Sequence, residues 1–189
     1  MSRLCELAEK YGSDKTAKFR HPYTPFYDEL LRDRNVQRVL EIGIGTPACM
    51  NSFVPNYEVG ASLRMWRDYF PAAEIVGLDN DPSAFIQEDR ILSVKCDQSS
   101  RVSLVSTAQI LGGKFDFIVD DGSHRYDHQA LTANTLIPKL LSSTGVYVIE
   151  DVMYPKELYA LLNWPAEVKL FDYKRTPDDC LFIIEGSKI

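Results

Sequence analysis

The chain has 189 residues, 45% of them hydrophobic and 25% charged, which is enough for one domain with a substantial core. Its formal net charge of −6 argues against nucleic acid or an anionic membrane as a general partner, because both attract basic patches. No apolar run approaches the roughly 20 residues of a membrane span, and the N-terminus lacks a signal-peptide pattern.

The N-terminal residues predict two short helices before the first strand. Apolar residues at helical spacing lead up to Gly12, a polar loop follows, and a second helix is expected over 24–32. We expect residues 1–189 to form a single domain in which 1–35 is a helical lid segment. His21, in the polar loop, is favoured as a structural histidine. The four cysteines form no C-x-x-C pair, which predicts free thiols in a reducing, cytoplasmic compartment.

The remaining chain alternates strands and helices. Strands are expected from residue 38 and over 74–79, 91–95, 115–119, 145–149, 167–172 and 180–185, and helices over 61–70, 99–111, 127–141 and 155–162. Such alternation predicts a parallel sheet with helices on both faces. The last two strands, joined by a short polar turn at 174–179, should pair antiparallel. This is an α/β, Rossmann-like fold of seven strands with a C-terminal hairpin, the architecture of class I methyltransferases.

The first strand ends in Glu41 and a loop containing Gly43 and Gly45, a pattern typical of a nucleotide-like ligand site, although a plain strand and turn also fits. With Ala48, the glycines match a relaxed dinucleotide fingerprint, which requires a helix to open directly from the loop. Residues 49–57 indicate a loop instead. S-adenosylmethionine, which has no pyrophosphate to place on a helix N-terminus, is therefore favoured over NAD.

Polar residues also end the next two strands. Asp79 follows the second strand, where an acid can bind the ribose hydroxyls of an adenosyl ligand. The alternative is that Asp79 is only a turn residue. Asp97 and Gln98 follow the third strand, where they could meet the adenine edge. We also expect Gly45 and Asp120 among the cofactor-binding residues.

Acidic pairs end the fourth and fifth strands. Asp120 and Asp121 precede His124, and Glu150 and Asp151 follow the neighbouring strand, so the carboxylates should face one small volume. A cation or a proton must compensate such a cluster, and hard oxygen ligands favour Mg²⁺, Mn²⁺ or Ca²⁺ over zinc. His124 could then remove a proton from a metal-bound hydroxyl. The alternative is that these residues cap turns and the next helix.

Seven segments resemble the Mg²⁺-dependent sugar O-methyltransferases of macrolide biosynthesis, of the mycinamicin and macrocin type, which are related to cephalosporin hydroxylase-like proteins. They are the segments at 11–15, 40–45, 60–66 (Gly-Ala-Ser-Leu-Arg-Met-Trp), 75–79, 97–98, 120–124 (Asp-Asp-Gly-Ser-His) and 148–151. In contrast to the macrolide enzymes, we expect no large N-terminal auxiliary domain here, which leaves the acceptor open and a homo-oligomer possible.

The resemblance implies roles for particular residues. It implies that Asp121, Glu150 and Asp151 hold the metal and that His124 is the general base. It also implies that S-adenosylmethionine lies against Glu41, Gly43, Ser62, Asp79 and Asp97.

We therefore expect an O-methyltransferase that acts on a hydroxyl of a sugar or other vicinal diol of a small natural product. The alternatives are a non-catalytic S-adenosylmethionine-binding or scaffold protein and, less favoured, an NAD-dependent oxidoreductase. A scaffold protein would be expected to have a broken acidic cluster, and here the cluster is intact.

Overall fold

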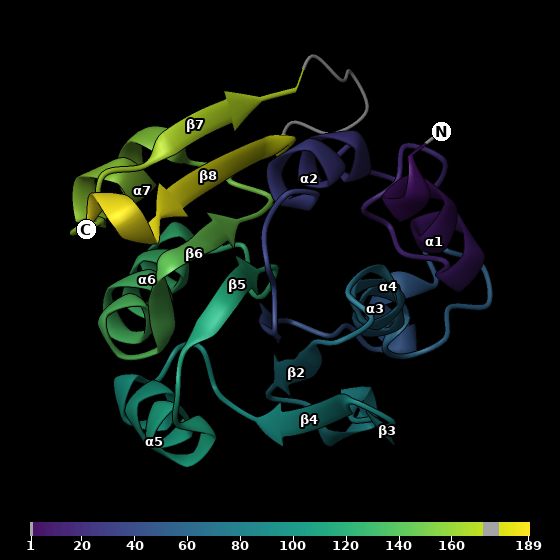
Figure 1. Ribbon diagram of the computed structural model, residues 1–189, viewed down its shortest axis with the longest axis horizontal. Coiled ribbons are helices and arrows are strands. Elements are labelled where there is room, and N and C mark those ends of the chain that lie inside the picture. The colour runs from purple at the N-terminus through teal and green to yellow at the C-terminus, as the bar shows by residue number, and fades with distance from the viewer. Residues whose placement is uncertain (1, 172–177) are drawn as a thin grey trace.

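The computed structural model describes residues 2–171 and 178–189, and it contains one eight-stranded sheet flanked by helices (Figure 1). The strand order is β3-β4-β2-β1-β5-β6-β8-β7. The strands are β1 (Arg38–Ile42), β2 (Glu74–Asp79), β3 (Gln87–Glu88), β4 (Ile91–Lys95), β5 (Phe115–Asp120), β6 (Leu141–Ile149), β7 (Glu167–Leu170) and β8 (Cys180–Glu185). The five strands β4, β2, β1, β5 and β6 run parallel, whereas β8 is antiparallel to both β6 and β7.

Two layers of helices cover the sheet. The helices are α1 (Arg3–Tyr11), α2 (Thr24–Leu31), α3 (Pro47–Met50), α4 (Ala61–Tyr69), α5 (Arg101–Leu111), α6 (Tyr126–Leu140) and α7 (Pro155–Leu161). Figure 1 shows α1, α2 and α4 on one side of the sheet and α5, α6 and α7 on the other. Each side has its own apolar core, and the core beneath α1, α2 and α4 contains the buried rings of Tyr27 and Trp66. None of the described helices is long and apolar enough to cross a membrane.

The predicted parallel sheet, its closing antiparallel hairpin and its two helical layers are confirmed. All seven expected strands are present, and the eighth is the two-residue edge strand β3, which is too short to carry a sequence pattern. The strand expected over 145–149 begins earlier, at Leu141. Residues 172–177 lie outside the described residues. They include the expected end of one strand, at residue 172, and most of the turn expected at 174–179.

The expectation of a loop over 49–57 is wrong at its start. Cys49 and Met50 complete the one-turn helix α3, because Thr46 caps it by accepting a hydrogen bond from the Cys49 amide and Pro47 occupies its first turn. A helix therefore does open from the glycine loop, but it lasts only four residues.

The chain order positions the site. From β1 the chain builds outward to β2 and then β4, and it later returns to place β5 on the other side of β1. Ligands of open parallel sheets bind outside the carboxyl ends of the strands at such a reversal.

Candidate active site

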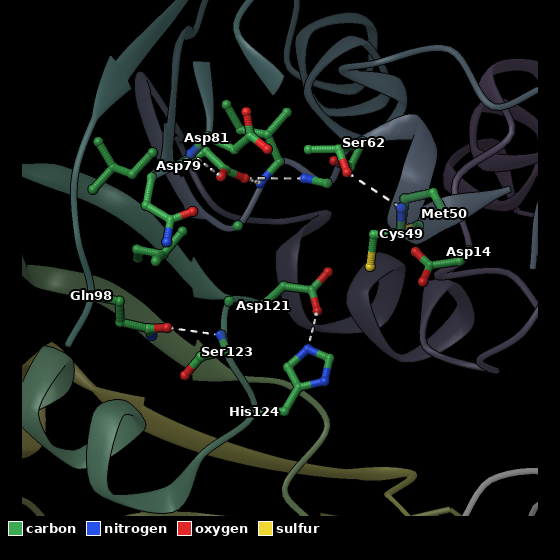
Figure 2. Close-up of a pocket in the computed structure, with 18 of the residues that line it drawn as sticks. Asp14, Cys49, Met50, Ser62, Asp79, Asp81, Gln98, Asp121, Ser123 and His124 are labelled. Carbon is green, nitrogen blue, oxygen red and sulfur yellow. Dashed lines mark hydrogen bonds and ion pairs between the residues drawn. The ribbon is translucent and has the colours of Figure 1, made fainter. Parts of the chain in front are cut away.

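A cavity of about 460 Å³ lies at the carboxyl ends of β1, β2, β4 and β5. Six of the residues predicted to bind the cofactor line it, together with Asp121 and His124 (Figure 2): Gly43, Gly45, Ser62, Asp79, Asp97 and Gln98. Glu41, Asp120, Glu150 and Asp151 are buried beneath its wall.

The glycine loop is shaped by contacts within the protein. Gly43 has φ +88°, and a Cβ there would overlap the backbone carbonyl of Asp121, so the loop after β1 lies directly against the loop after β5. Asp79 fixes the same loop by accepting hydrogen bonds from the Ile44 and Gly45 amides, at 3.0 and 3.3 Å. The other carboxylate oxygen of Asp79 accepts from the Asp81 amide over 2.9 Å, so the backbone engages both oxygens, and the contact of Asp79 with a ribose stays a prediction.

Gln98 joins the loops that follow β4 and β5. Its Nε2 donates to Asp120 over 2.5 Å, and its Oε1 accepts from the Ser123 amide over 2.8 Å. Asp120 also accepts from the Tyr147 hydroxyl, and burial raises its pKa to about 7. The structure therefore places Asp120 behind the wall that Gln98 forms, and its predicted cofactor contact is not tested.

Glu41 likewise lies behind the cavity wall. It accepts a hydrogen bond from the indole of Trp66 over 3.0 Å and lies 3.4 Å from the ammonium of Lys15. Burial raises the pKa of Glu41 to about 7 although Lys15 opposes the shift. Its contact with the cofactor also stays a prediction.

The ends of β5 and β6 bring Asp121, His124 and Asp151 together, as the strand order predicts. His124 Nε2 lies 3.2 Å from Asp121 Oδ1, and His124 Nδ1 lies 3.7 Å from Asp151 Oδ2. His124 and Asp151 both adopt left-handed backbone conformations, with φ of +54° and +51°. Such conformations are uncommon for residues other than glycine and are enriched at functional sites.

The neighbouring carboxylates determine the charge of His124. Burial alone would lower the pKa of the imidazole, but Asp121 and Asp151 raise it to about 9. Lys15 and His124 in turn hold the pKa of Asp121 below its usual range despite burial. Without a further cation, His124 is therefore protonated at neutral pH.

A lysine that the sequence interpretation did not assign lies at the centre of the cluster. Lys15 is 1% exposed, and its ammonium lies 2.5 Å from Asp121 Oδ2, 2.6 Å from Glu150 Oε2 and 3.4 Å from Glu41 Oε1. Although burial would lower the pKa of Lys15, these carboxylates raise it well above the usual value. The other oxygen of Glu150 accepts from the Tyr27 hydroxyl over 2.5 Å. In the sequence, the signal that could have pointed to Lys15 is its place beside an aspartate in the Gly-Ser-Asp-Lys segment.

His21 is a second histidine that contacts Asp151, at the same carboxylate oxygen that His124 approaches. Its Nε2 lies 3.2 Å from Asp151 Oδ2 and its Nδ1 lies 2.6 Å from Asp179 Oδ1. The Tyr23 hydroxyl donates to Asp151 Oδ1 over 2.6 Å, and the rings of Tyr23 and His21 stack. Burial opposes a charge on His21, but Asp151 and Asp179 prevail and raise its pKa to about 9.

The donor set fits a hard divalent cation. Asp121, His124 and Asp151 each offer one ligand atom, and these atoms lie within 4.8 Å of one another. Mg²⁺ prefers carboxylate oxygens over imidazole nitrogen, so Asp121 and Asp151 suit the ion and His124 remains available as a base beside it. Both oxygens of Glu150 already accept hydrogen bonds, from Lys15 and Tyr27. Its predicted role as a ligand is not tested, and an ion would have to share or replace these contacts, as it would the contacts that Asp121 makes with Lys15 and Asp151 makes with Tyr23.

Comparison with known proteins gives related sequences over most of the chain. Mycinamicin VI 2''-O-methyltransferase of Micromonospora griseorubida is 36% identical over 179 residues, which cover 94% of this chain. The chain is homologous to part of the mycinamicin- and macrocin-type O-methyltransferases. The macrocin type is represented by demethylmacrocin O-methyltransferase of Streptomyces fradiae, 38% identical over 151 residues and 79% of this chain. No protein-family model matches the chain.

A solved structure of this type has the same fold. The methyltransferase of the mycinamycin biosynthetic pathway, in complex with Mg and SAH, aligns with a TM-score of 0.69 and 38% identity over 82% of this chain. The fold is therefore that of a class I methyltransferase, as predicted. The chain spans 40% and 36% of the lengths of the two curated relatives and 39% of the solved chain.

Proposed function

We propose that the chain carries out methyl transfer from S-adenosylmethionine to a hydroxyl of a small glycosylated or vicinal-diol natural product, assisted by Mg²⁺. The observation that carries the proposal is the position of Asp121 and His124. They line the cavity that the glycine loop, Asp79 and Asp97 also line, so a base and metal-binding oxygens face the predicted cofactor space. The named substrates and the Mg and SAH ligands of the relatives support the same assignment.

Asp121 and Asp151 are the residues that would hold the ion. When bound, Mg²⁺ would supply Lewis acidity that favours negative charge on an acceptor oxygen. The cavity walls orient the acceptor hydroxyl toward the sulfonium methyl group, and orientation supplies much of the acceleration. The imidazole of His124 accepts the hydroxyl proton. Because Asp121 and Asp151 raise its pKa, this role requires that their charges be compensated.

The experiment is a methyl-transfer screen against glycosides and catechols, with Mg²⁺ or with excess chelator. We expect transfer to a diol-containing acceptor that chelator abolishes and Mg²⁺ restores. Asp121→Asn should require much more Mg²⁺ for half-maximal activation. Asp127→Asn is the matched control, because Asp127 is an exposed acid on α6 that pairs with Arg125. Activity that survives chelation would reject metal assistance, and a well-folded protein without transfer to any acceptor would count against the enzyme.

The setting of the reaction follows from composition. We propose that the protein works in the cytoplasm, where Cys5, Cys49, Cys96 and Cys180, all free thiols in the structure, stay reduced. The net charge of −6 disfavours nucleic acid as the acceptor. Association into a homo-oligomer stays a prediction that the molar mass in solution would test.

A further inference from the structure

The sheet ends at β7, and the outer side of this strand carries an exposed apolar surface. β7 pairs with β8 on one side, and among residues 2–171 and 178–189 no strand pairs with its other side (Figure 1). All four residues of β7 are exposed, Val168 at 41% and Leu170 at 69%. An edge strand of this kind offers its amide and carbonyl groups to a further strand.

The backbone of Val168 faces away from β8. The Phe171 amide donates to the Asp179 carbonyl over 3.1 Å, so Phe171 faces the neighbouring strand. Residues of an antiparallel pair alternate between those that exchange hydrogen bonds with their neighbour and those that do not. By this alternation Lys169 also faces β8, whereas Val168 and Leu170 direct their amide and carbonyl groups outward. The outer edge of β7 therefore presents hydrogen-bonding groups centred on Val168.

The side chains of β7 form two rows of different chemistry. The ammonium of Lys169 lies over the ring of Phe26 on α2, 5.7 Å from its centre, so Lys169 and Glu167 point to the side of the sheet that α2 covers. Val168 and Leu170 point to the other side, which α7 covers. One row therefore carries an acid and a base two residues apart, and the other row is apolar.

We propose that two copies of the chain associate through β7, which pairs antiparallel with β7 of the second copy about a two-fold axis at Val168. In this register Glu167 of each copy lies opposite Lys169 of the other, so two pairs of opposite charge form. On the apolar side Val168 meets its counterpart, and Leu170 lies opposite Ala166. A two-fold axis at Glu167 or at Lys169 would instead set like charges against each other. The strand is thus complementary to itself in one register.

This association is independent of the proposed function. The candidate active site lies at the carboxyl ends of β1, β2, β4 and β5, whereas the pairing joins the two sheets at their β7 edges. One pair of short strands buries less surface than a standard protein–protein interface, so we expect a dimer that dissociates in the micromolar range.

The test is sedimentation equilibrium of the full chain from micromolar to near-millimolar concentration, at low ionic strength, where surface charges are least screened. Glu167→Lys and Lys169→Glu each convert both acid–base pairs into like-charge pairs. Glu157→Lys is the matched control, because Glu157 is an exposed acid on α7, outside β7, and its reversal changes the net charge by the same amount as Glu167→Lys.

We expect the wild type to pass from the mass of one chain to twice that mass. Glu167→Lys and Lys169→Glu should each raise the dissociation constant by about tenfold or more, while Glu157→Lys should stay within about twofold of the wild type. An equimolar mixture of the two β7 variants should associate as the wild type does, because each strand then meets the opposite charges. The double variant Glu167→Lys/Lys169→Glu should also associate, for the same reason.

A wild type that stays monomeric over the whole concentration range would overturn the proposal. So would a dimer that neither single β7 variant weakens, because another surface would then hold it. A mixture of the two variants that stays monomeric would overturn the antiparallel register, and with it the proposal. Misfolding of the single variants cannot imitate the expected result, since their mixture must recover the dimer.

Discussion

The ammonium group of Lys15 donates a hydrogen bond to Glu150 over 2.6 Å, although 135 residues separate the two in the chain. Both side chains are 1% exposed. The same ammonium also neutralises Asp121 and Glu41, so the loop between α1 and α2 supplies a permanent cation to the acidic ends of β1, β5 and β6. The acidic cluster therefore has a built-in counter-ion in addition to any metal that it binds.

Lys15→Met should leave these carboxylates buried without a cation. Removal of one partner of a buried ion pair costs about 3–5 kcal/mol, so we expect a loss of that size in the free energy of unfolding, measured in urea with chelator present. Mg²⁺ should restore part of the loss by compensating the acids. Lys18→Met, which removes an exposed pair with Glu9, should cost less than about 1 kcal/mol. Equal stability of the two variants would show that Lys15 does not neutralise the cluster.

Gly43→Ala tests the contact between the loops after β1 and β5. Both Gly43 and Gly112 have positive φ, but an added Cβ meets no atom within 4 Å at Gly112 and would overlap the Asp121 carbonyl at Gly43. Gly112→Ala should cost about 1–3 kcal/mol for the backbone conformation alone, because φ of 52° with ψ of 174° is a region that residues other than glycine rarely adopt. Gly43→Ala should cost about 1–3 kcal/mol more because of the overlap. Similar unfolding free energies for the two variants would contradict the close approach.

The features that could be predicted from the sequence are those that leave a local pattern in it. Apolar runs gave the strands, and the rule that parallel strands deliver their loops to one edge placed Asp121 and His124 beside Asp151. Lys15 could not be placed in this way, since its partners lie at or just beyond the carboxyl ends of strands that begin 23 or more residues later, and nothing local marks a buried lysine.

The contacts of Asp151 and Asp120 could not be predicted either, because they also join distant parts of the chain. His21 contacts Asp179, 158 residues away, and it also contacts Asp151. The interpretation of His21 as a structural histidine indicated neither contact. Strand ends identified Glu41 and Asp120, but whether a carboxylate at a strand end faces the cavity or points behind it depends on side-chain packing. Trp66 engages Glu41, and Gln98 with Tyr147 engages Asp120.

His124→Ala separates catalysis from cofactor binding. The imidazole lines the cavity and contacts Asp121, so its loss should lower turnover by about 10²- to 10⁴-fold, the usual contribution of a general base. S-adenosylhomocysteine affinity, measured by calorimetry, should stay within a few-fold of the wild type. His128→Ala is the control, because His128 also lines the cavity but its ring contacts Ser123. Comparable turnover in the two variants would remove His124 from the role of base.

His21 should make the stability of the metal-free protein depend on pH. Its pKa is about 9 in the folded protein against an ordinary 6.5, so the folded state binds the proton more tightly than the unfolded state. The stabilisation, roughly 3 kcal/mol for a shift of this size, is fully present below pH 6.5 and is lost as pH rises through about 9.

His21→Asn should therefore destabilise the protein most near pH 6 and least near pH 10, when unfolding is followed in urea with chelator present. A difference between variant and wild type that stays constant across this range would contradict a charged His21 between Asp151 and Asp179.

The most direct test of the central claim is calorimetric titration of the wild-type chain with S-adenosylhomocysteine and with NAD in the presence of Mg²⁺, since it needs no knowledge of the acceptor. The account predicts saturable binding of one S-adenosylhomocysteine per chain and no binding of NAD. Binding of NAD in preference, or of neither ligand, would contradict the assignment of the cavity to an adenosyl methyl donor.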